Sequence, residues 1–260
     1  MASPPITLIT GASGGIGAAL AWQAAASGHH LILTGRRTHL LTELAEALTA
    51  RHGGNILTIE SDLSAPDGAD SLINSIIAHG WRVDHLINNA GFGTAGDLAS
   101  IPPARLQSLV HVNILSLTTL TRQLLPPMLS KGSGGILNVA SLAAFQPGPL
   151  MAAYYASKSY VLSLTEALHH ECKGSGVRVS CLCPGATATG FASEAHMENS
   201  RLFLSNPMTA ETVARIGWRG YLRGRRVIIP GWKNKTLAIL SKITPHAVSL
   251  PLVRKLHESA

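Results

Sequence analysis

The stretch PITLITGASGGIG, residues 5–17, decides the fold of this 260-residue chain. Its first half, Pro5 to Thr10, is a short apolar run with β-branched residues, which is typical of a buried parallel strand. Glycines follow at once, and from Ile16 to Ala26 the apolar residues recur at helical spacing. A strand, a glycine-rich turn and a helix in succession indicate the first unit of an α/β sheet.

The same alternation continues along the chain. Further strands are predicted at 30–34, 55–60, 83–88, 135–140, 177–183 and 227–230, with helices at 40–50, 102–130 and 151–172 and another beginning near Thr209. This order requires right-handed crossovers and predicts a Rossmann-like, doubly wound parallel sheet of about seven strands with helices on both faces. No repeat or linker interrupts the pattern, so residues 1–260 are expected to form a single domain. The irregular stretch 187–208 is expected to cover the substrate.

Composition excludes several classes of protein. Hydrophobic residues make up 46% of the chain and charged residues 13%, which indicates a folded globular protein. Three cysteines, Cys172, Cys181 and Cys183, are too few for a disulfide framework and point to the cytoplasm. Cys181 and Cys183 fit alternate positions on a buried strand. No second pair of Cys or His residues with the spacing of a zinc site accompanies them, so no metal site is predicted. The sequence suggests neither a signal peptide nor a membrane span.

The net charge of +7 is concentrated in one region. Residues 1–200 carry −2 and residues 201–260 carry +9, counting Lys and Arg against Asp and Glu. Aromatic residues are only 5% and no nucleic-acid motif is present, so nucleic acid is not an expected partner. The basic tail, residues 232–260, is amphipathic and could lie on an anionic membrane, pack on its own domain or contact a sister subunit.

The glycine-rich turn is the candidate phosphate site. Backbone N–H groups and the helix dipole at this position can hold a pyrophosphate, although a tight turn alone would also explain the glycines. The candidate contacts are Gly11, Ser13, Gly14, Gly15, Ile16 and Gly17.

Arg36 and Arg37 follow the second strand, where cofactor choice is made. An acidic residue there would bind a ribose 2′-hydroxyl, whereas a guanidinium suits a 2′-phosphate. The two arginines therefore predict NADP(H), the alternative being the solvated start of a helix.

Tyr154 and Lys158 are four residues apart near the start of a predicted helix, so they share one face. A tyrosine has a pKa of about 10, and a nearby ammonium can lower it by favouring the phenolate. The spacing alone occurs by chance in many helices, so its meaning depends on the motifs around it.

Those motifs resemble the short-chain dehydrogenase/reductase family over most of the chain. The segments that match follow the strands: the turn Thr10 to Gly17 after the first, Asp62 and Leu63 after the third, Asn88 to Gly91 (which includes Asn89 and Ala90) at the end of the fourth, and Pro184, Gly185, Thr187 and Thr189 after the sixth. The single residues that match are Asn113, Ser141, Tyr154 and Lys158. The resemblance implies that Asp62 contacts the adenine and that the Thr residue after the sixth strand contacts the nicotinamide amide.

The resemblance also implies the chemistry. Tyr154 would exchange a proton with the substrate oxygen while hydride passes to or from the nicotinamide. Ser141 would orient that oxygen, Lys158 would lower the pKa of Tyr154 and hold the ribose, and Asn113 would anchor a water that relays protons to Lys158. We expect a homodimer or homotetramer.

Residues expected to border the substrate are mostly apolar: Phe92, Gly93, 142–151 and Phe191 onward. A hydrophobic carbonyl or alcohol substrate is therefore favoured over a small anion. The prediction is an NADP(H)-dependent carbonyl reductase or alcohol dehydrogenase. The alternatives are a 3-oxoacyl or steroid-type reductase and, more remotely, a non-catalytic NADP-sensing regulator.

Overall fold

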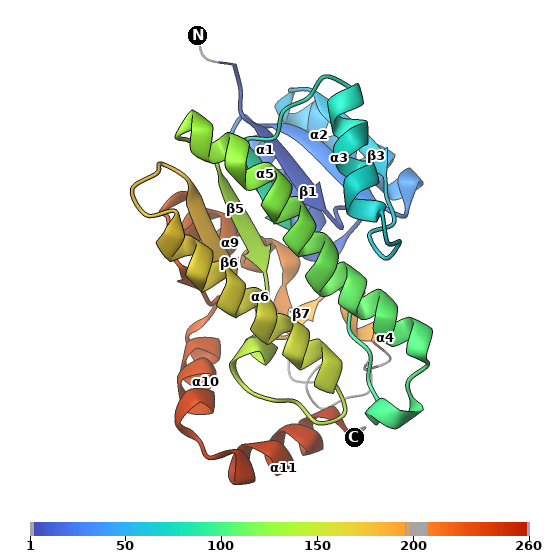
Figure 1. Cartoon of the computed structure of the whole chain (residues 1–260), viewed down its shortest axis with the longest axis vertical. Helices are drawn as coiled ribbons and strands as arrows, with labels where there is room; N and C mark the ends of the chain where they lie inside the picture. Colours follow the sequence, from blue (N-terminus) through green and yellow to red (C-terminus); the bar gives the residue numbers. More distant parts are fainter. Residues whose placement is uncertain (1–2, 196, 198–206, 259–260) are drawn as a thin grey trace.

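A parallel sheet of seven strands forms the centre of the molecule, in the order β3-β2-β1-β4-β5-β6-β9 (Figure 1). The computed structural model describes residues 3–195, 197 and 207–258. The strands are β1 (Ile6–Thr10), β2 (His30–Gly35), β3 (Ile56–Glu60), β4 (His85–Asn88), β5 (Gly135–Val139), β6 (Arg178–Leu182) and β9 (Val227–Ile228). Because the strand order reverses between β1 and β4, the carboxyl ends of these strands border a crevice where ligands of such folds bind.

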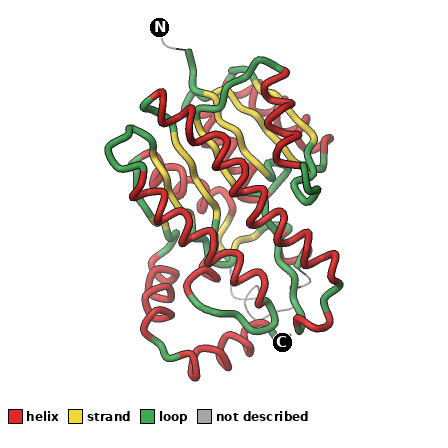
Figure 2. The backbone as a smooth tube through the Cα atoms, viewed as in Figure 1, coloured by secondary structure: helices red, strands yellow, loops and turns green. Residues whose placement is uncertain are grey.

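Helices cover both faces of the sheet (Figures 1 and 2). The principal helices are α1 (Gly15–Ala26), α2 (Thr38–His52), α3 (Gly68–Ala78), α4 (Pro103–Val110), α5 (Leu117–Lys131), α6 (Ala152–Glu171), α9 (Ala210–Leu222), α10 (Trp232–Ile243) and α11 (His246–His257). Neighbouring residues of β1 point to opposite faces: Ile9 packs with α1, α2 and α9, whereas Leu8 packs with α3 and α5. The predicted fold class is confirmed.

Two features of the helices were not predicted. Helix α3 follows β3, and its buried residues Leu72, Ile73 and Ile76 carry a helical periodicity in the sequence. The helix expected over 102–130 is divided into α4 and α5 by a π-helical turn, His111–Ser116. That turn contains Asn113, which is only 1% exposed.

The chain after β6 builds the region beyond the sheet edge. A small two-stranded sheet joins β7 (Thr187–Ala188) to β8 (Met208–Thr209), with the short helix α7 (Phe191–Glu194) between them. Residues 196 and 198–206 of the segment expected to cover the substrate lie outside the described residues. The tail forms α10 and α11, which extend past the sheet (Figure 1). Within the part of the chain that the structure describes, no helix has the length and apolarity needed to cross a bilayer.

Candidate active site

A cavity of about 700 Å³ opens at the carboxyl ends of the strands. Its wall contains every predicted site residue except Gly17 and Asn113, which lie behind it. The predicted residues in the wall are Gly11, Ser13, Gly14, Gly15, Ile16, Arg36, Arg37, Asp62, Leu63, Asn89, Ala90, Gly91, Ser141, Tyr154, Lys158, Pro184, Gly185, Thr187 and Thr189.

The glycine-rich turn has a backbone that side chains would obstruct. Gly11 and Gly15 have φ of +64° and +54°, in the left-handed region. A Cβ on Gly17 would lie 2.3 Å from the carbonyl oxygen of Gly11, so only a glycine allows this close packing of helix α1 on the turn. Helix α1 begins at Gly15 on the cavity wall, and the first N–H groups of a helix are suited to binding an anion.

The end of β4 is braced against this turn. The Nδ2 atom of Asn89 donates to the carbonyl oxygens of Thr10 and Gly11, at 3.0 and 3.1 Å. The Thr10 hydroxyl accepts from the backbone N–H groups of Asn89 and Ala90, each at 3.0 Å. The turn is therefore held by polar contacts with a neighbouring strand.

Arg36 and Arg37 are exposed at the edge of the cavity. The Nη2 atom of Arg37 donates to the carbonyl oxygen and the hydroxyl of Ser13, at 3.2 and 3.1 Å. Hydrogen bonds from the side chain and backbone of Ser64 lower the pKa of Asp62, and Arg36 is a smaller cause in the same direction. Two cations thus border the same part of the cavity as the glycine-rich turn.

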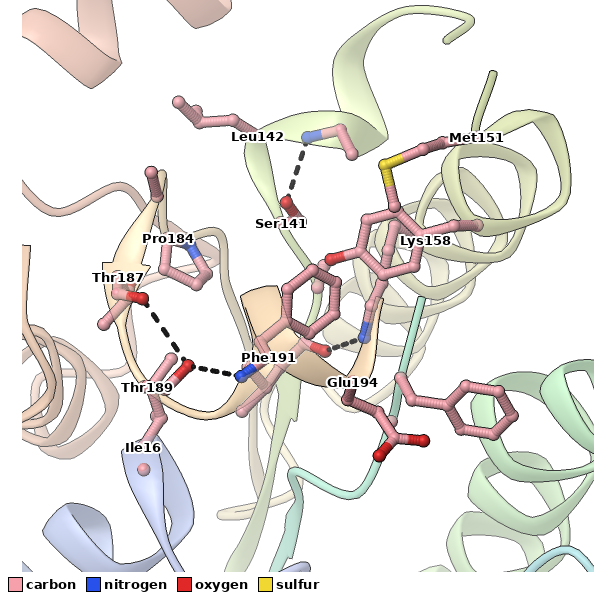
Figure 3. Close-up of a pocket in the computed structure, with 18 of the residues that line it drawn as sticks. Ile16, Ser141, Leu142, Met151, Lys158, Pro184, Thr187, Thr189, Phe191 and Glu194 are labelled. Carbon is pink, nitrogen blue, oxygen red and sulfur yellow. Dashed lines mark hydrogen bonds between the residues drawn. The ribbon is translucent and has the colours of Figure 1, made fainter. Parts of the chain in front are cut away.

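Ser141, Tyr154 and Lys158 all line this cavity, and Figure 3 shows Ser141 and Lys158 among its lining side chains. Ser141 follows β5, and Tyr154 and Lys158 occupy successive turns of α6. Tyr154 and Lys158 are only 8% and 5% exposed. The Lys158 ammonium donates to the carbonyl oxygen of Val139 at 3.0 Å and lies 5.8 Å from the centroid of the Tyr154 ring.

Burial determines the proton affinities of this pair. It raises the pKa of Tyr154 to about 12, against a smaller lowering by a hydrogen bond with Ser141. It also lowers the pKa of Lys158 to about 8. Lys158 is not among the causes of the shift at Tyr154, so the expectation that it lowers the pKa of Tyr154 stays a prediction. Desolvation of the phenol dominates, and the ammonium is directed to Val139 instead of the phenol oxygen.

Asn113 lies behind the cavity wall and holds the loop after β4. Its Oδ1 atom accepts from the backbone N–H of Phe92 at 3.1 Å, and its Nδ2 atom donates to the Phe92 carbonyl and to the Ser157 hydroxyl, each at 3.0 Å. A Cβ on Gly91 would lie 3.1 Å from the Asn113 oxygen and 3.2 Å from the Lys158 nitrogen. The π-helical turn thus brings Asn113 next to Lys158 at Gly91.

The substrate side of the cavity agrees only partly with the sequence-based expectation. Phe92, Leu142, Met151 and Phe191 lie in the wall, whereas Gly93 and residues 144–145 and 147–150 do not. The Phe191 ring lies 5.2 Å from that of Tyr154.

Two contributors to this side were not predicted. The guanidinium of Arg105 lies 4.2 Å from the centroid of the Phe92 ring and donates to Glu194 Oε1 at 2.8 Å. An arginine paired with a glutamate therefore lies beside Phe92, on the substrate side of the cavity. Helices α10 and α11 also supply one end of the wall. Only their apolar periodicity was visible in the sequence.

Known proteins resemble this chain over most of its length. The family described as short chain dehydrogenase matches residues 5–200. The ketoacyl reductase HetN of Nostoc sp. is 31% identical over 94% of this chain and 80% of its own length. The 11-beta-hydroxysteroid dehydrogenase 1A of Arabidopsis thaliana is 36% identical over 69% of this chain, which spans about half, 51%, of that relative.

Solved structures agree with these relatives. A short-chain dehydrogenase from Sphingobium yanoikuyae in complex with NADPH superposes with a TM-score of 0.81 at 29% identity, covering 92% of this chain and 96% of that one. A short chain dehydrogenase/reductase from Burkholderia phymatum in complex with NAD gives a TM-score of 0.82 at 26% identity, covering 99% and 98%. The family match, the relatives and the Rossmann-like parallel sheet agree. The chain belongs to the short-chain dehydrogenase/reductase family of oxidoreductases.

Proposed function

We propose that this protein is an NADP(H)-dependent oxidoreductase that interconverts an apolar aldehyde or ketone and its alcohol. The observation that carries the proposal is the convergence of Ser141, Tyr154 and Lys158 in one cavity with the glycine-rich turn. The apolar lining beside Ser141 and Tyr154 supports an apolar substrate.

Each of these side chains has a proposed task. When bound, the nicotinamide cofactor supplies or accepts the hydride. Tyr154 gives its phenolic proton to the substrate oxygen during reduction, and its raised pKa keeps that proton in place at neutral pH. Ser141 orients the same oxygen by a hydrogen bond. Lys158 supplies positive charge beside the phenol and binds the ribose of the cofactor.

Asn113 acts through its neighbours in this proposal. Its contacts with Phe92 position the loop that follows β4. Its closeness to Lys158 at Gly91 supports a water relay between the two side chains.

The decisive test replaces the proposed acid. Tyr154→Phe should lower kcat by about 10²- to 10⁴-fold, the contribution of a positioned general acid. Tyr160→Phe is the matched control, because Tyr160 lies on the same helix but is 38% exposed and outside the cavity wall. Undiminished activity of Tyr154→Phe on every substrate turned over would overturn the mechanism. Tight NADPH binding without turnover of any substrate by the wild type would favour a regulator.

The preference for NADP(H) rests on Arg36 and Arg37 and on the absence of an acidic residue at the end of β2. Arg36→Ala should raise the KM for NADPH about 10- to 100-fold and change the KM for NADH little, since a charge-assisted contact of this kind contributes about 1.5–3 kcal/mol. Arg37→Ala should also loosen Ser13 and weaken both cofactors. Equal losses for both cofactors in Arg36→Ala would contradict the 2′-phosphate role.

The names of the relatives favour two narrower substrate classes, 3-oxoacyl compounds and steroids. Aldehydes, ketones, 3-oxoacyl thioesters and a steroid ketone, assayed with NADPH, distinguish these classes. A kcat/KM at least tenfold higher for a thioester or a steroid than for simple ketones would select that class.

We also propose that α10 docks on an anionic membrane surface. Trp232, Ile239 and Ile243 lie on one face of this helix and are 72%, 63% and 71% exposed. Lys235 and Lys242 flank that face, and residues 201–260 carry +9. A helix with a Trp-containing apolar face and flanking lysines suits the interface of a bilayer with anionic lipid.

Sedimentation with vesicles tests this docking. The chain should sediment with phosphatidylserine-containing vesicles, less so at high salt, and Trp232→Ser with Ile243→Ser should abolish the effect. Point variants are preferable to removal of the tail, because α10 and α11 also line the cavity. Unchanged sedimentation of the double variant would contradict the proposal. A change of oligomeric state in that variant would instead indicate contact with a second copy.

A further inference from the structure

Helices α10 and α11 form the end of the cavity that lies beyond Tyr154. Their contribution to the wall is Leu237, Ala238, Leu240, Ser241, Ser249, Leu252, Val253, Leu256 and His257, with Thr244 between the helices. None of these residues is acidic, lysine or arginine. This end of the cavity therefore offers an uncharged, largely apolar surface.

Each helix turns one regular stripe toward this space. Apart from Ala238, the residues of α10 and its end that line the cavity recur at i, i+3, i+4 and i+7, from Leu237 to Thr244. Those of α11 recur in the same way, from Ser249 to Leu256. Because residues at these spacings share a helical face, the two helices present matched stripes to the same cavity.

The wall is fixed in place by hydrogen bonds at the end of α11. The Nε2 atom of His257 lies 2.9 Å from the Tyr155 hydroxyl, and its Nδ1 atom lies 2.8 Å from the carbonyl oxygen of Pro149. Burial lowers the pKa of His257, so the ring is neutral at pH 7 and can donate from Nδ1 while accepting at Nε2. Val253, only 3% exposed, anchors the same helix in the core.

Large apolar side chains on this wall nevertheless remain open to solvent. Leu240 is 47% exposed and Leu252 is 64% exposed, although both line the cavity. The buried Ser249 hydroxyl has no hydrogen-bond partner among the described residues. A ligand that covered the two leucines would remove apolar surface from water, which favours binding.

We propose that this space binds the aliphatic chain of the substrate, so that the protein acts on medium-chain aliphatic ketones or aldehydes with about eight to ten carbons. The stripe from Ser249 to Leu256 spans eight residues, or about 10 Å of helix, which a chain of roughly this length matches. This inference rests on the proposed function, because the carbonyl end of the chain must reach Tyr154.

The experiment measures kcat/KM with NADPH for 2-ketones from four to twelve carbons. Each added methylene should raise kcat/KM about threefold to fourfold up to eight to ten carbons, after which the rise should stop. The increase should appear mainly in KM.

Two variants and one shared control locate the site. Leu252→Asn and Leu240→Asn should each lower kcat/KM for 2-decanone at least tenfold and leave that for 2-butanone within twofold. The control is Val248→Asn, because Val248 is 60% exposed on α11 but lies outside the cavity wall. This control should match the wild type for both ketones.

The outcomes separate the two proposals. A flat chain-length series with turnover of short ketones would overturn the chain site and leave the proposed function standing, as would a tenfold preference for a fused-ring ketone over 2-decanone. If no carbonyl compound is turned over, the proposed function fails and calorimetry decides the chain site. Binding of 2-decanone that Leu252→Asn weakens and Val248→Asn does not would support it, and equal or undetectable binding would overturn it.

Discussion

Buried titratable side chains gather at both ends of the same sheet, yet the two groups differ in what surrounds them. At the amino end, the His29 ring contacts the Thr7 hydroxyl at 2.7 Å and the His85 ring contacts the Tyr221 hydroxyl at 2.6 Å, both through Nδ1. At the carboxyl end, Tyr154 and Lys158 face a cavity.

Burial shifts proton affinity at both ends in the direction that disfavours charge. It lowers the pKa of His29 and lowers that of His85 to about 4, with the Asp84 carboxylate opposing the shift in each case. The same effect acts on Tyr154 and Lys158. A shifted pKa alone therefore does not identify a functional site. Tyr154 and Lys158 differ from the two histidines in that they line a cavity that a ligand can enter.

Lys158→Met should separate function from stability most strongly. Activity should fall about 100-fold or more, whereas the free energy of unfolding at pH 7 should rise by about 1–3 kcal/mol, because a buried ammonium no longer has to be desolvated. Steady-state kinetics and urea unfolding of the same preparation measure the two effects. A loss of stability that accompanies the loss of activity would show that Lys158 is structural, like the histidines.

His85→Gln should change the pH dependence of stability and leave the activity unchanged, in contrast to Lys158→Met. A histidine with a folded pKa of about 4 and an ordinary pKa of 6.5 gives stability that is present above pH 6.5 and lost as the pH falls toward 4. The wild type should lose about 3 kcal/mol between these values through His85, and the variant should lack this loss. Urea unfolding across this range checks the slope, and kcat at pH 7 should stay within twofold of the wild type. A changed kcat would remove the contrast between the two ends.

The pH profile of the reaction sharpens the comparison further. Since the pKa of Lys158 is about 8, its cation is present below that pH and lost above it, so kcat/KM for reduction should decline up to about tenfold per pH unit above 8. Lys158→Arg should move this decline to higher pH, because arginine stays charged. A decline at the same pH in the variant would assign it to another group.

His79→Gln should have the smallest effect. His79 is exposed near the end of α3 and contacts only the Ser75 carbonyl of its own turn among the described residues. Acid unfolding and kcat should match the wild type within about 0.5 kcal/mol and twofold. An acid-stability change as large as that of His85→Gln would show that burial is not its cause.

The sequence was sufficient to predict the fold and many residues of the cavity wall. The strand, turn and helix of residues 5–26 and their repetition predicted the parallel sheet, because apolar period and glycine placement are local properties. Helix α3 was missed although its period was present. The motif residues other than Gly17 and Asn113 lie in one cavity wall because parallel strands bring their carboxyl ends together.

Only the tertiary structure decided what depends on distance and burial. The raised pKa of Tyr154 follows from its desolvation, which outweighs the hydrogen bond with Ser141. The place of Asn113 follows from a π-helical turn, and the substrate wall follows from how α10 and α11 pack. Spacing along the chain determined that Tyr154 and Lys158 share a helical face. It could not determine the dielectric environment around them, which is set by residues far away in sequence.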